Sequence, residues 1–141
     1  MSLGKSNMIN EQHYQIGEVA EKVGLSLRTI RYYEEVGLVI PSGRSDGGFR
    51  LYTDPDIERL RLIKALKPIG MSLEAMAELL EVRDQLADPG REDKAEIGAR
   101  LDQLLEQGRQ ACNQLDARVD AARQALAGLE TAGGPVGQSR R

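Results

Sequence analysis

The sequence of 141 residues has one cysteine, one histidine and no tryptophan, and aromatic residues make up only 4% of it. A lone Cys112 cannot form a disulfide within the chain, and no Cys-x-x-Cys or Cys/His pair offers metal-ligand spacing. No segment approaches the roughly 18 apolar residues of a membrane span, and the N-terminus lacks the apolar core of a secretion signal. We therefore expect a cytoplasmic chain with no metal, no cofactor and no membrane contact.

The scarcity of reactive side chains also argues against an enzyme. The only histidine, His13, lies in a polar leader, and no nucleophile stands at a spacing that pairs it with a base. Gly47 and Gly48 lack the lysine and the helix that complete a phosphate-binding loop. The adjacent acids Glu34 and Glu35 are better explained as surface charge than as an acid/base pair. We expect them to form local salt bridges.

The chain is acidic, with a formal net charge of −3 and a pI of about 5.3, but the acidity is unevenly distributed. Residues 13–72 contain nine Lys or Arg against eight Asp or Glu, whereas residues 81–130 contain seven against eleven. Binding to phosphates requires cations on one face, not a basic chain as a whole. The overall charge therefore does not exclude DNA as a partner.

The segment from Gly24 to Gly37 predicts one short, complete helix. A serine at position 26 can cap its first amides, and Gly37 can end it in a left-handed turn. A first set of residues recurs at helical spacing and predicts an inward stripe, whereas a second set falls on the opposite face. The inward set is Leu27, Ile30, Tyr33 and Val36, and the outward set is Arg28, Arg31, Tyr32 and Glu35.

A second short amphipathic helix is predicted just upstream, from Ile16 to Val23. Two short helices joined through Gly24 and Leu25 have the outline of a helix-turn-helix, whose second helix enters the major groove of DNA. An ordinary helical hairpin with a solvated charged face fits the same spacing equally well.

The residues Ile-Arg-Tyr-Tyr-Glu-Glu-Val-Gly-Leu, at 30–38, closely resemble the recognition helix of the MerR family of bacterial transcription regulators. The resemblance continues through residues 47–52 and 63–80, so it covers the chain from about Tyr14 to Leu80. It implies a homodimer that binds double-stranded promoter DNA, deforms it and acts on RNA polymerase there. It also favours DNA binding over the ordinary hairpin.

A β-hairpin is predicted after the recognition helix, with β-prone residues at 38–40, turn residues at 41–48 and an alternating segment at 49–52. Beside a recognition helix such a hairpin acts as a wing, where Arg44 and Arg50 are placed to meet phosphates. Arg44 fits a solvated loop residue equally well, whereas Arg50 matches the wing arginine of the family.

Two further helices are predicted after the wing. Asp54-Pro55 has the form of an N-cap followed by a first-turn proline, and Ser72 can cap the next helix. The MerR resemblance implies that the turn between these helices grips the DNA backbone, with Lys64 and Lys67 as the contacts.

From Glu92 to about Leu129 the chain has no proline and consists of strong helix formers, which predicts a long helix. Its apolar residues alternate in steps of four and three, with a register shift after position 115, as in a coiled coil. We expect the seam to consist of Ile97, Leu101, Leu104, Gly108, Ala111, Leu115, Val119, Ala122 and Leu126, followed by Leu129.

This helix would span about 55 Å, too long for so small a globule to cover alone, so we expect it to pair with a second copy. The resemblance implies antiparallel pairing, which the seam by itself does not show. The alternative, considered the minority case, is a hairpin within one chain against the helix at 73–86. On the dimer interpretation, Leu104→Asp would separate the subunits.

Cys112 lies near the middle of the predicted coiled coil. A buried small residue at a helix interface is the simpler interpretation, and an intersubunit thiol or redox sensor is the sharper one. Metal-sensing MerR relatives carry cysteines near both ends of the dimer helix, but residues 88–92 and 133–138 contain none. The effector is therefore not identified.

The predicted fold is mainly α: a winged helix-turn-helix domain with a small β-hairpin wing, followed by a long coiled-coil dimerisation helix. We expect a flexible leader at 1–13, the DNA-binding domain at 14–87, the dimerisation helix at 91–130 and a disordered tail at 131–141 with no further domain. Tyr33 is assigned to the core first and to DNA second. A DNA-architectural or recombination-accessory protein without effector sensing remains the alternative function. The predicted DNA contacts are Arg28, Arg31, Tyr32, Tyr33, Arg44, Arg50, Lys64 and Lys67.

Overall fold

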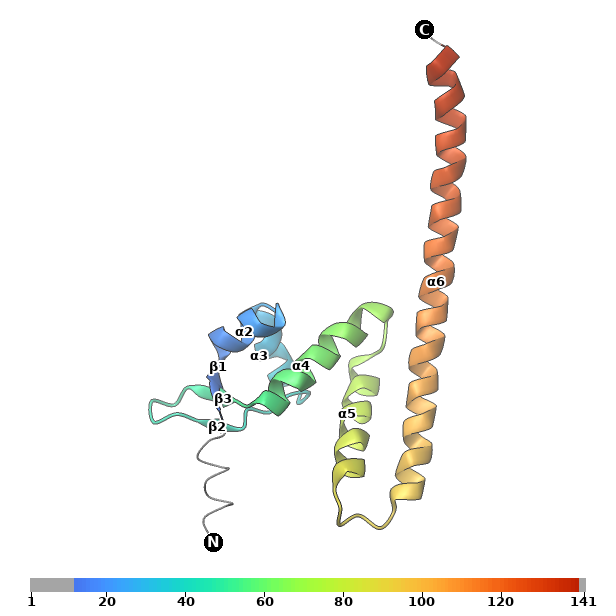
Figure 1. Ribbon diagram of the computed structural model, residues 1–141. Helices are drawn as coiled ribbons and strands as arrows, with labels where there is room; N and C mark the ends of the chain where they lie inside the picture. Colours follow the sequence, from blue (N-terminus) through green and yellow to red (C-terminus); the bar gives the residue numbers. More distant parts are fainter. Residues whose placement is uncertain (1–11, 140–141) are drawn as a thin grey trace.

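The computed structural model describes the backbone of residues 12–139 and the side chains of residues 12–133. A head of short helices and a small sheet is joined to a helical hairpin, and the second helix of the hairpin extends far beyond it (Figure 1). This arrangement confirms the predicted fold class. The elements in chain order are β1 (Tyr14–Gln15), α2 (Ile16–Val23), α3 (Leu27–Glu35), β2 (Gly43–Arg44), β3 (Arg50–Tyr52), α4 (Asp54–Leu66), the 3-10 helix η1 (Lys67–Ile69), α5 (Leu73–Ala87) and α6 (Lys94–Ser139).

Helix α3 begins and ends where its caps predict. The Ser26 hydroxyl accepts the Thr29 amide at 3.0 Å, and Gly37 leaves the helix with φ +82°. The predicted inward stripe is wrong at both ends, because Leu27 and Val36 are 40% and 45% exposed. Nine residues make about two and a half helical turns, so residues spaced strictly by three drift from one side to the other.

The three-stranded sheet has β3 in the centre, paired antiparallel with β1 and with β2. The wing is the β2–β3 hairpin, and the strand predicted at 38–40 is absent. The amides of Leu38 and Val39 instead donate to the Tyr33 carbonyl, at 2.9 and 3.4 Å. Both side chains are buried, so this segment ends α3 and fills the core.

Helix α4 has its N-cap at Thr53, one residue before the predicted Asp54. The Thr53 amide donates to Asp56 Oδ2 at 2.9 Å, and the Ser42 hydroxyl donates to the same oxygen at 2.6 Å. One carboxylate therefore caps α4 and ties the segment just before β2 to it. Helix α5 is capped as predicted, with the Ala75 amide donating to Ser72 Oγ at 3.0 Å.

Two apolar clusters hold the elements together. The first lies inside the head and continues onto the start of α5, and its fully buried members include Val19, Ile30, Tyr52, Leu60, Ile63 and Met76. The second joins α5 to α6 through Val82, Ile97 and Leu104, with Leu79, Leu86 and Leu101 packed against it.

The second cluster corrects the predicted dimer seam. Ile97, Leu101 and Leu104 pack on α5 of the same chain, and Leu104 is only 1% exposed. Gly108 lies next to the residues just before α5, because a Cβ added to it would be 3.7 Å from the Met71 sulfur. The hairpin that was considered the minority case therefore holds for the first part of α6.

The remainder of α6 extends away from the hairpin as a single helix (Figure 1). The helix continues to Ser139, so the prediction of a disordered tail at 131–141 is wrong for residues 131–139. Once a helix exists, each further residue adds a hydrogen bond without a new nucleus, so weak helix formers can extend it. Residues 140–141, and residues 1–11 of the predicted leader, lie outside the described part.

Among the described residues, no helix combines the length and the apolar character that a membrane span requires.

Candidate nucleic-acid interface

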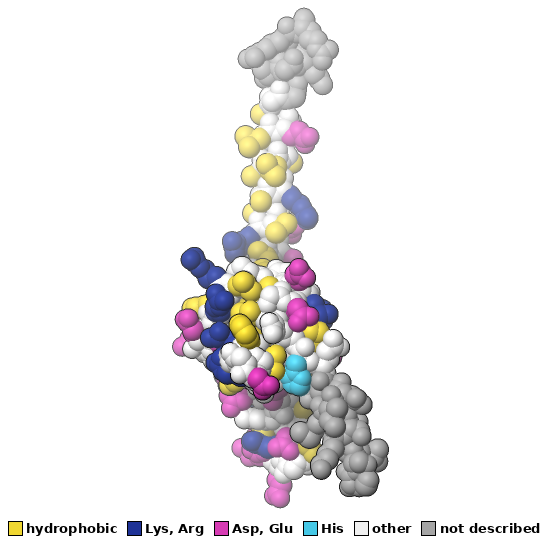
Figure 2. Space-filling view, turned by 90° about the vertical axis from the view of Figure 1, so that its left-hand side faces the viewer, with side chains coloured by type: hydrophobic (Ala, Val, Ile, Leu, Met, Phe, Trp, Pro, Cys, Tyr) yellow, Lys and Arg dark blue, Asp and Glu magenta, His cyan; other side chains and the backbone are white. Residues whose placement is uncertain are grey.

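Helix α3 presents two arginines and a tyrosine on its outer face. Arg28, Arg31 and Tyr32 are exposed, whereas Ile30 and Tyr33 on the inner face are buried. Neither arginine forms an ion pair with any residue whose side chain the structure describes. Seen from the side of the wing, basic side chains gather along one edge of the head, and acidic side chains lie on both edges (Figure 2). The face is therefore free to meet phosphates or base edges.

The wing stands next to this face. Arg31 of α3 shares a small pocket of about 130 Å³ with Gly48, Phe49 and Arg50 of the wing, above the start of α2. At the tip, the Arg44 guanidinium donates to the Gly48 carbonyl at 3.1 Å, which holds the turn closed. Recognition helix and wing thus form one continuous surface.

Glu34 joins the recognition helix to the wing. Its carboxylate pairs with the Arg50 guanidinium and accepts the Tyr52 hydroxyl at 3.0 Å. Burial of the fully enclosed Tyr52 ring, and then its bond to Glu34, raise the pKa of the Tyr52 hydroxyl. Glu34 was predicted to have a local ion-pair partner, but Arg50 and Tyr52 are 16 and 18 residues away. Arg50, predicted as a phosphate contact, is thus also a structural link between α3 and β3.

The two predicted lysine contacts differ in their surroundings. The Lys64 ammonium donates to the Val23 carbonyl at 2.8 Å, at the end of α2, where a cation is favoured by the helix dipole. Lys64 therefore holds α2 against α4. Lys67 is exposed at the first position of η1. Of the two, Lys67 is better placed to meet a phosphate.

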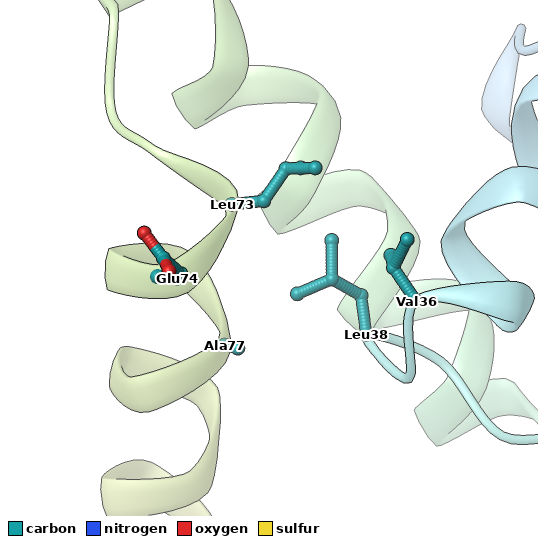
Figure 3. A pocket seen from close by; sticks show the side chains of 5 residues that line it. All are labelled: Val36, Leu38, Leu73, Glu74 and Ala77. Carbon is teal, nitrogen blue, oxygen red and sulfur yellow. The ribbon is translucent and has the colours of Figure 1, made fainter.

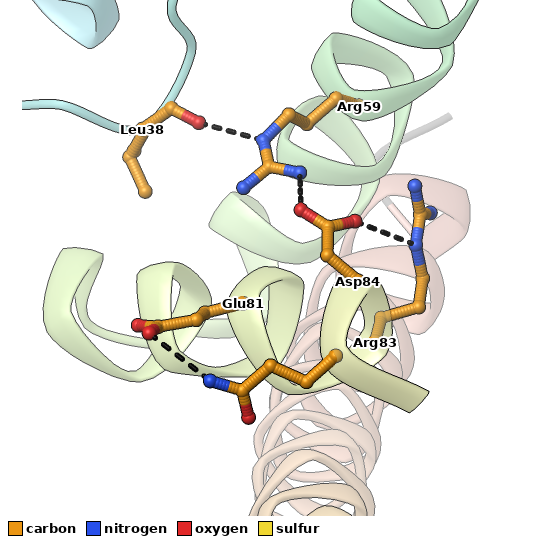
Figure 4. Close-up of polar contacts among 6 residues, drawn as sticks. Leu38, Arg59, Glu81, Arg83 and Asp84 are labelled. Carbon is orange, nitrogen blue, oxygen red and sulfur yellow. Dashed lines mark hydrogen bonds and ion pairs between the residues drawn. The ribbon is translucent and has the colours of Figure 1, made fainter. Parts of the chain in front are cut away.

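Arg59 is a linking residue that the sequence analysis did not identify. Its Nε donates to the Leu38 carbonyl at 2.9 Å, and its Nη1 donates to Asp84 Oδ2 at 2.7 Å (Figure 4). One guanidinium therefore connects the exit of α3, helix α4 and helix α5. Nothing in the local pattern indicates this role, because both partners are more than twenty residues away along the chain.

An apolar pocket of about 440 Å³ lies between the end of α3 and the start of α5. Val36, Leu38 and Leu73 point into it, and Ala77 and Glu74 complete its lining on α5 (Figure 3). Across the described residues, no group of three or more His, Cys, Asp or Glu is arranged to hold a metal ion. The exposure of Val36, which the inward stripe did not predict, is explained by this opening.

Two family models match the chain. Residues 14–82 match the model described as MerR HTH family regulatory protein, and residues 57–131 match the one described as MerR, DNA binding. The HTH-type transcriptional regulator ZntR of Escherichia coli is 40% identical over 89 residues, covering 62% of this chain and 63% of the relative. The HTH-type transcriptional activator TipA of Streptomyces coelicolor is 41% identical over 76 residues, covering 54% of this chain and 29% of that relative. The chain therefore covers less than two thirds of either relative.

Two solved structures are similar over most of the chain. A putative MerR family transcriptional regulator from Listeria monocytogenes superposes with a TM-score of 0.70 at 25% identity, covering 90% of this chain and 91% of that one. HiNmlR, a MerR family regulator lacking the sensor domain and bound to promoter DNA, gives a TM-score of 0.59 at 28% identity, covering 87% and 96%. The matches thus include α6 as well as the head.

Proposed function

Because the chain belongs to the MerR family of DNA-binding transcription regulators, we propose that it binds a pseudo-palindromic promoter operator as a homodimer and distorts the DNA. The observation that carries the proposal is the outer face of α3, where Arg28, Arg31 and Tyr32 are exposed beside the wing. The similarity to a family member bound to promoter DNA supports it. The family is one of regulators, in agreement with the expectation that the chain is not an enzyme.

In this proposal the exposed side chains of the head contact bases or phosphates, and the buried ones support α3. Arg28 and Arg31 enter the major groove, where a bidentate arginine-guanine pair contributes about 1 to 3 kcal/mol of discrimination. Tyr32 and Lys67 contact phosphates, which position the protein without reading sequence. Tyr33 is buried and supports α3 from behind.

The wing residues act mainly on the shape of the interface. Arg44 closes the turn at the tip, and Arg50 holds the wing to α3 through Glu34. Arg50 lines the same pocket as Arg31 of α3, so in this proposal it also contacts the DNA backbone, and Arg44 adds a contact from the tip of the wing. Lys64 contributes indirectly, because it fixes α2 to α4 behind the recognition helix.

The homodimer presents two heads, so its operator has two inverted half-sites. Bending a site of a few helical turns costs on the order of 1 to 6 kcal/mol, which contacts at both heads offset. We propose that this deformation changes how RNA polymerase engages the promoter.

Selection of bound sequences from random duplex DNA tests the proposal. We expect enrichment of an inverted repeat with a constant half-site separation. Absence of any enriched motif at low salt would contradict sequence-specific binding. Transcription in vitro from a promoter that carries the selected site then distinguishes the two functions. A regulator changes the transcript yield, whereas an architectural protein bends the site and leaves the transcript yield unchanged.

A further inference from the structure

The head is attached to the helical hairpin along a short part of α5. The apolar side chains of α5 that pack on the cluster of the head lie between Leu73 and Leu80. This distance is about 10 Å at 1.5 Å per residue, or two helical turns. Val82 and Leu86 belong instead to the cluster shared with α6. The later part of α5 therefore has no apolar contact that fixes it to the head.

Two openings adjoin this attachment at the exit of α3. The apolar pocket of about 440 Å³ lies between Val36 and Leu38 of the exit and Leu73 of α5 (Figure 3). A second opening of about 240 Å³ is also lined by Leu38, together with Arg59 and Asp84. Because close packing is what makes protein interiors resist movement, these openings leave room for the head to tilt against α5.

A polar link joins the head to α5 beyond the apolar attachment. Asp84 lies one helical turn after Leu80, and its Oδ2 accepts Arg59 Nη1 at 2.7 Å (Figure 4). Arg59 Nε donates to the Leu38 carbonyl at 2.9 Å. Among the residues whose side chains the structure describes, no other ion pair joins α5 to the head.

The chemistry of arginine makes this link directional. A guanidinium is planar and holds its N–H groups in fixed directions, so the carbonyl and the carboxylate that it binds keep a fixed relation to each other. The carbonyl belongs to the exit of α3, and the carboxylate belongs to α5. A tilt of the recognition helix relative to the hairpin must therefore break or lengthen one of the two bonds.

We propose that Arg59 and Asp84 are positioning residues that set the angle between the head and the hairpin, and thereby the separation of the two half-sites that the dimer accepts. This inference rests on the proposed function, in which a homodimer places two heads on one operator. Both side chains act through the exit of α3 and not through contact with a base. They determine the spacing of the operator, whereas the outer face of α3 determines the sequence of each half-site.

A small tilt is sufficient to change the accepted separation. Helix α4, which carries Arg59, has 13 residues and is about 20 Å long. A tilt of roughly 10° moves the end of an arm of that length by about 3.5 Å, close to the rise of about 3.4 Å per base pair. The accompanying turn of about 35° per base pair is shared between the two heads and the twist of the DNA. Loss of the link should therefore permit neighbouring spacings.

Operators with altered spacing test the inference. The inverted repeat selected by the unsubstituted chain is compared with versions that have one base pair more or fewer between the half-sites, by fluorescence anisotropy. We expect the unsubstituted chain to bind the altered versions at least tenfold more weakly. Asp84→Ala should reduce this loss at least threefold, because its heads can tilt to reach the altered sites. Its discrimination against a mismatched base within one half-site should stay unchanged.

A second variant and a matched control accompany Asp84→Ala. Arg59→Lys keeps the positive charge, but its donors diverge from a single nitrogen atom and do not span both acceptors, so it should also accept altered spacings. Glu81→Ala is the control, because Glu81 lies on the same helix and accepts Gln85 of that helix at 3.3 Å. Both alanine variants lose one carboxylate and gain the same helix former. The side chain of Asp84 is 53% exposed, so its removal leaves no buried cavity.

The outcomes separate this inference from the proposed function. If Asp84→Ala and Arg59→Lys bind all spacings more weakly by one common factor, the link only supports the fold and the inference is overturned. The inference is also overturned if Glu81→Ala relaxes the spacing as much as Asp84→Ala does, or if the unsubstituted chain accepts all spacings equally. In each of these cases sequence-specific binding by a homodimer still stands. Failure of the unsubstituted chain to select any inverted repeat refutes both.

Discussion

At the scale of single residues, the charged side chains of the head fall into two groups. Arg28 and Arg31 of α3 point outward with no ion-pair partner among the described side chains. Glu34 and Lys64 are committed to contacts between elements, and such contacts set the angle at which α3 is presented. Substitutions in the first group should change binding, and those in the second should change stability.

Replacing Arg31 by alanine should weaken operator binding by about 10- to 100-fold, the equivalent of roughly 1 to 3 kcal/mol per lost arginine-guanine pair. The fold and the mass of the dimer should not change, because the side chain is exposed. Titration of labelled operator, followed by fluorescence anisotropy, measures the affinity. Arg83→Ala on α5 is the matched control, because it removes an exposed arginine away from the α3 face. Unchanged affinity of Arg31→Ala would remove that residue from the interface.

Tyr52 should make the stability of the fold sensitive to alkaline pH. Because burial raises the pKa of its hydroxyl, its contribution is complete below the unfolded tyrosine pKa of about 10 and is lost as pH rises beyond that value. Tyr52→Phe should lower the unfolding free energy at pH 7 by about 1.5 to 3 kcal/mol, the value of a hydrogen bond to a charged group.

Between pH 10 and 11, the stability of the unsubstituted chain should fall more steeply than that of Tyr52→Phe, by about 1 kcal/mol over that pH unit. Urea unfolding at several pH values measures both slopes. Tyr14 and Tyr33, whose pKa values are also raised, are present in both proteins and cancel in the comparison. Equal slopes would show that Tyr52 ionises as readily in the folded chain as in the unfolded one.

At the scale of elements, α6 is covered by α5 along its first part and exposed beyond it. Ile97, Leu101 and Leu104 pack on α5 of the same chain, whereas Val119, Leu126 and Leu129 are exposed on the part of α6 beyond the hairpin. Both parts have coiled-coil spacing, so the sequence alone merged them into one seam with a register shift. The covered part ends near Gly108, and apolar residues from Val119 onward are exposed.

Two matched substitutions separate these parts. Leu104→Asp, first expected to dissociate the dimer, should instead unfold the hairpin, since it places a charge at a site 1% exposed, and should cost on the order of 3 to 5 kcal/mol. Leu126→Asp, at a site 65% exposed, should leave the folded chain intact and dissociate the dimer. Urea unfolding and sedimentation measure the two effects. Dissociation by Leu104→Asp without loss of stability would contradict the division of the helix.

At the scale of the whole molecule, the dimer should couple two heads on one DNA. Each phosphate contact releases counterions, so the logarithm of the association constant falls with the logarithm of salt concentration by about 0.9 per contact. Lys67→Ala removes one proposed contact per head and should reduce the slope by about 2 for the dimer. Lys94→Ala, at the start of α6 away from the head, should leave the slope unchanged. A slope that Lys67→Ala does not alter would place η1 away from the DNA backbone.

The sequence by itself determined the features that depend on near neighbours. Ser26 and Ser72 cap helices because the amides they bond lie three residues away, and Gly37 ends α3 because it tolerates a positive φ. The segment at 30–38 carried the family resemblance for the same reason, since it is one uninterrupted helix and its exit. Local chemistry was sufficient to identify the head and its outward arginines.

The tertiary structure alone decided which surfaces are covered. Glu34 pairs with Arg50, 16 residues away, and Arg59 pairs with Asp84, 25 residues away, so neither pair produces a periodic pattern in the sequence. The packing of α5 on the first part of α6 likewise depends on the turn at 88–93, which brings two distant apolar faces together. Periodicity shows that a helix has an apolar face, but only the fold shows which neighbour covers it and which part remains exposed.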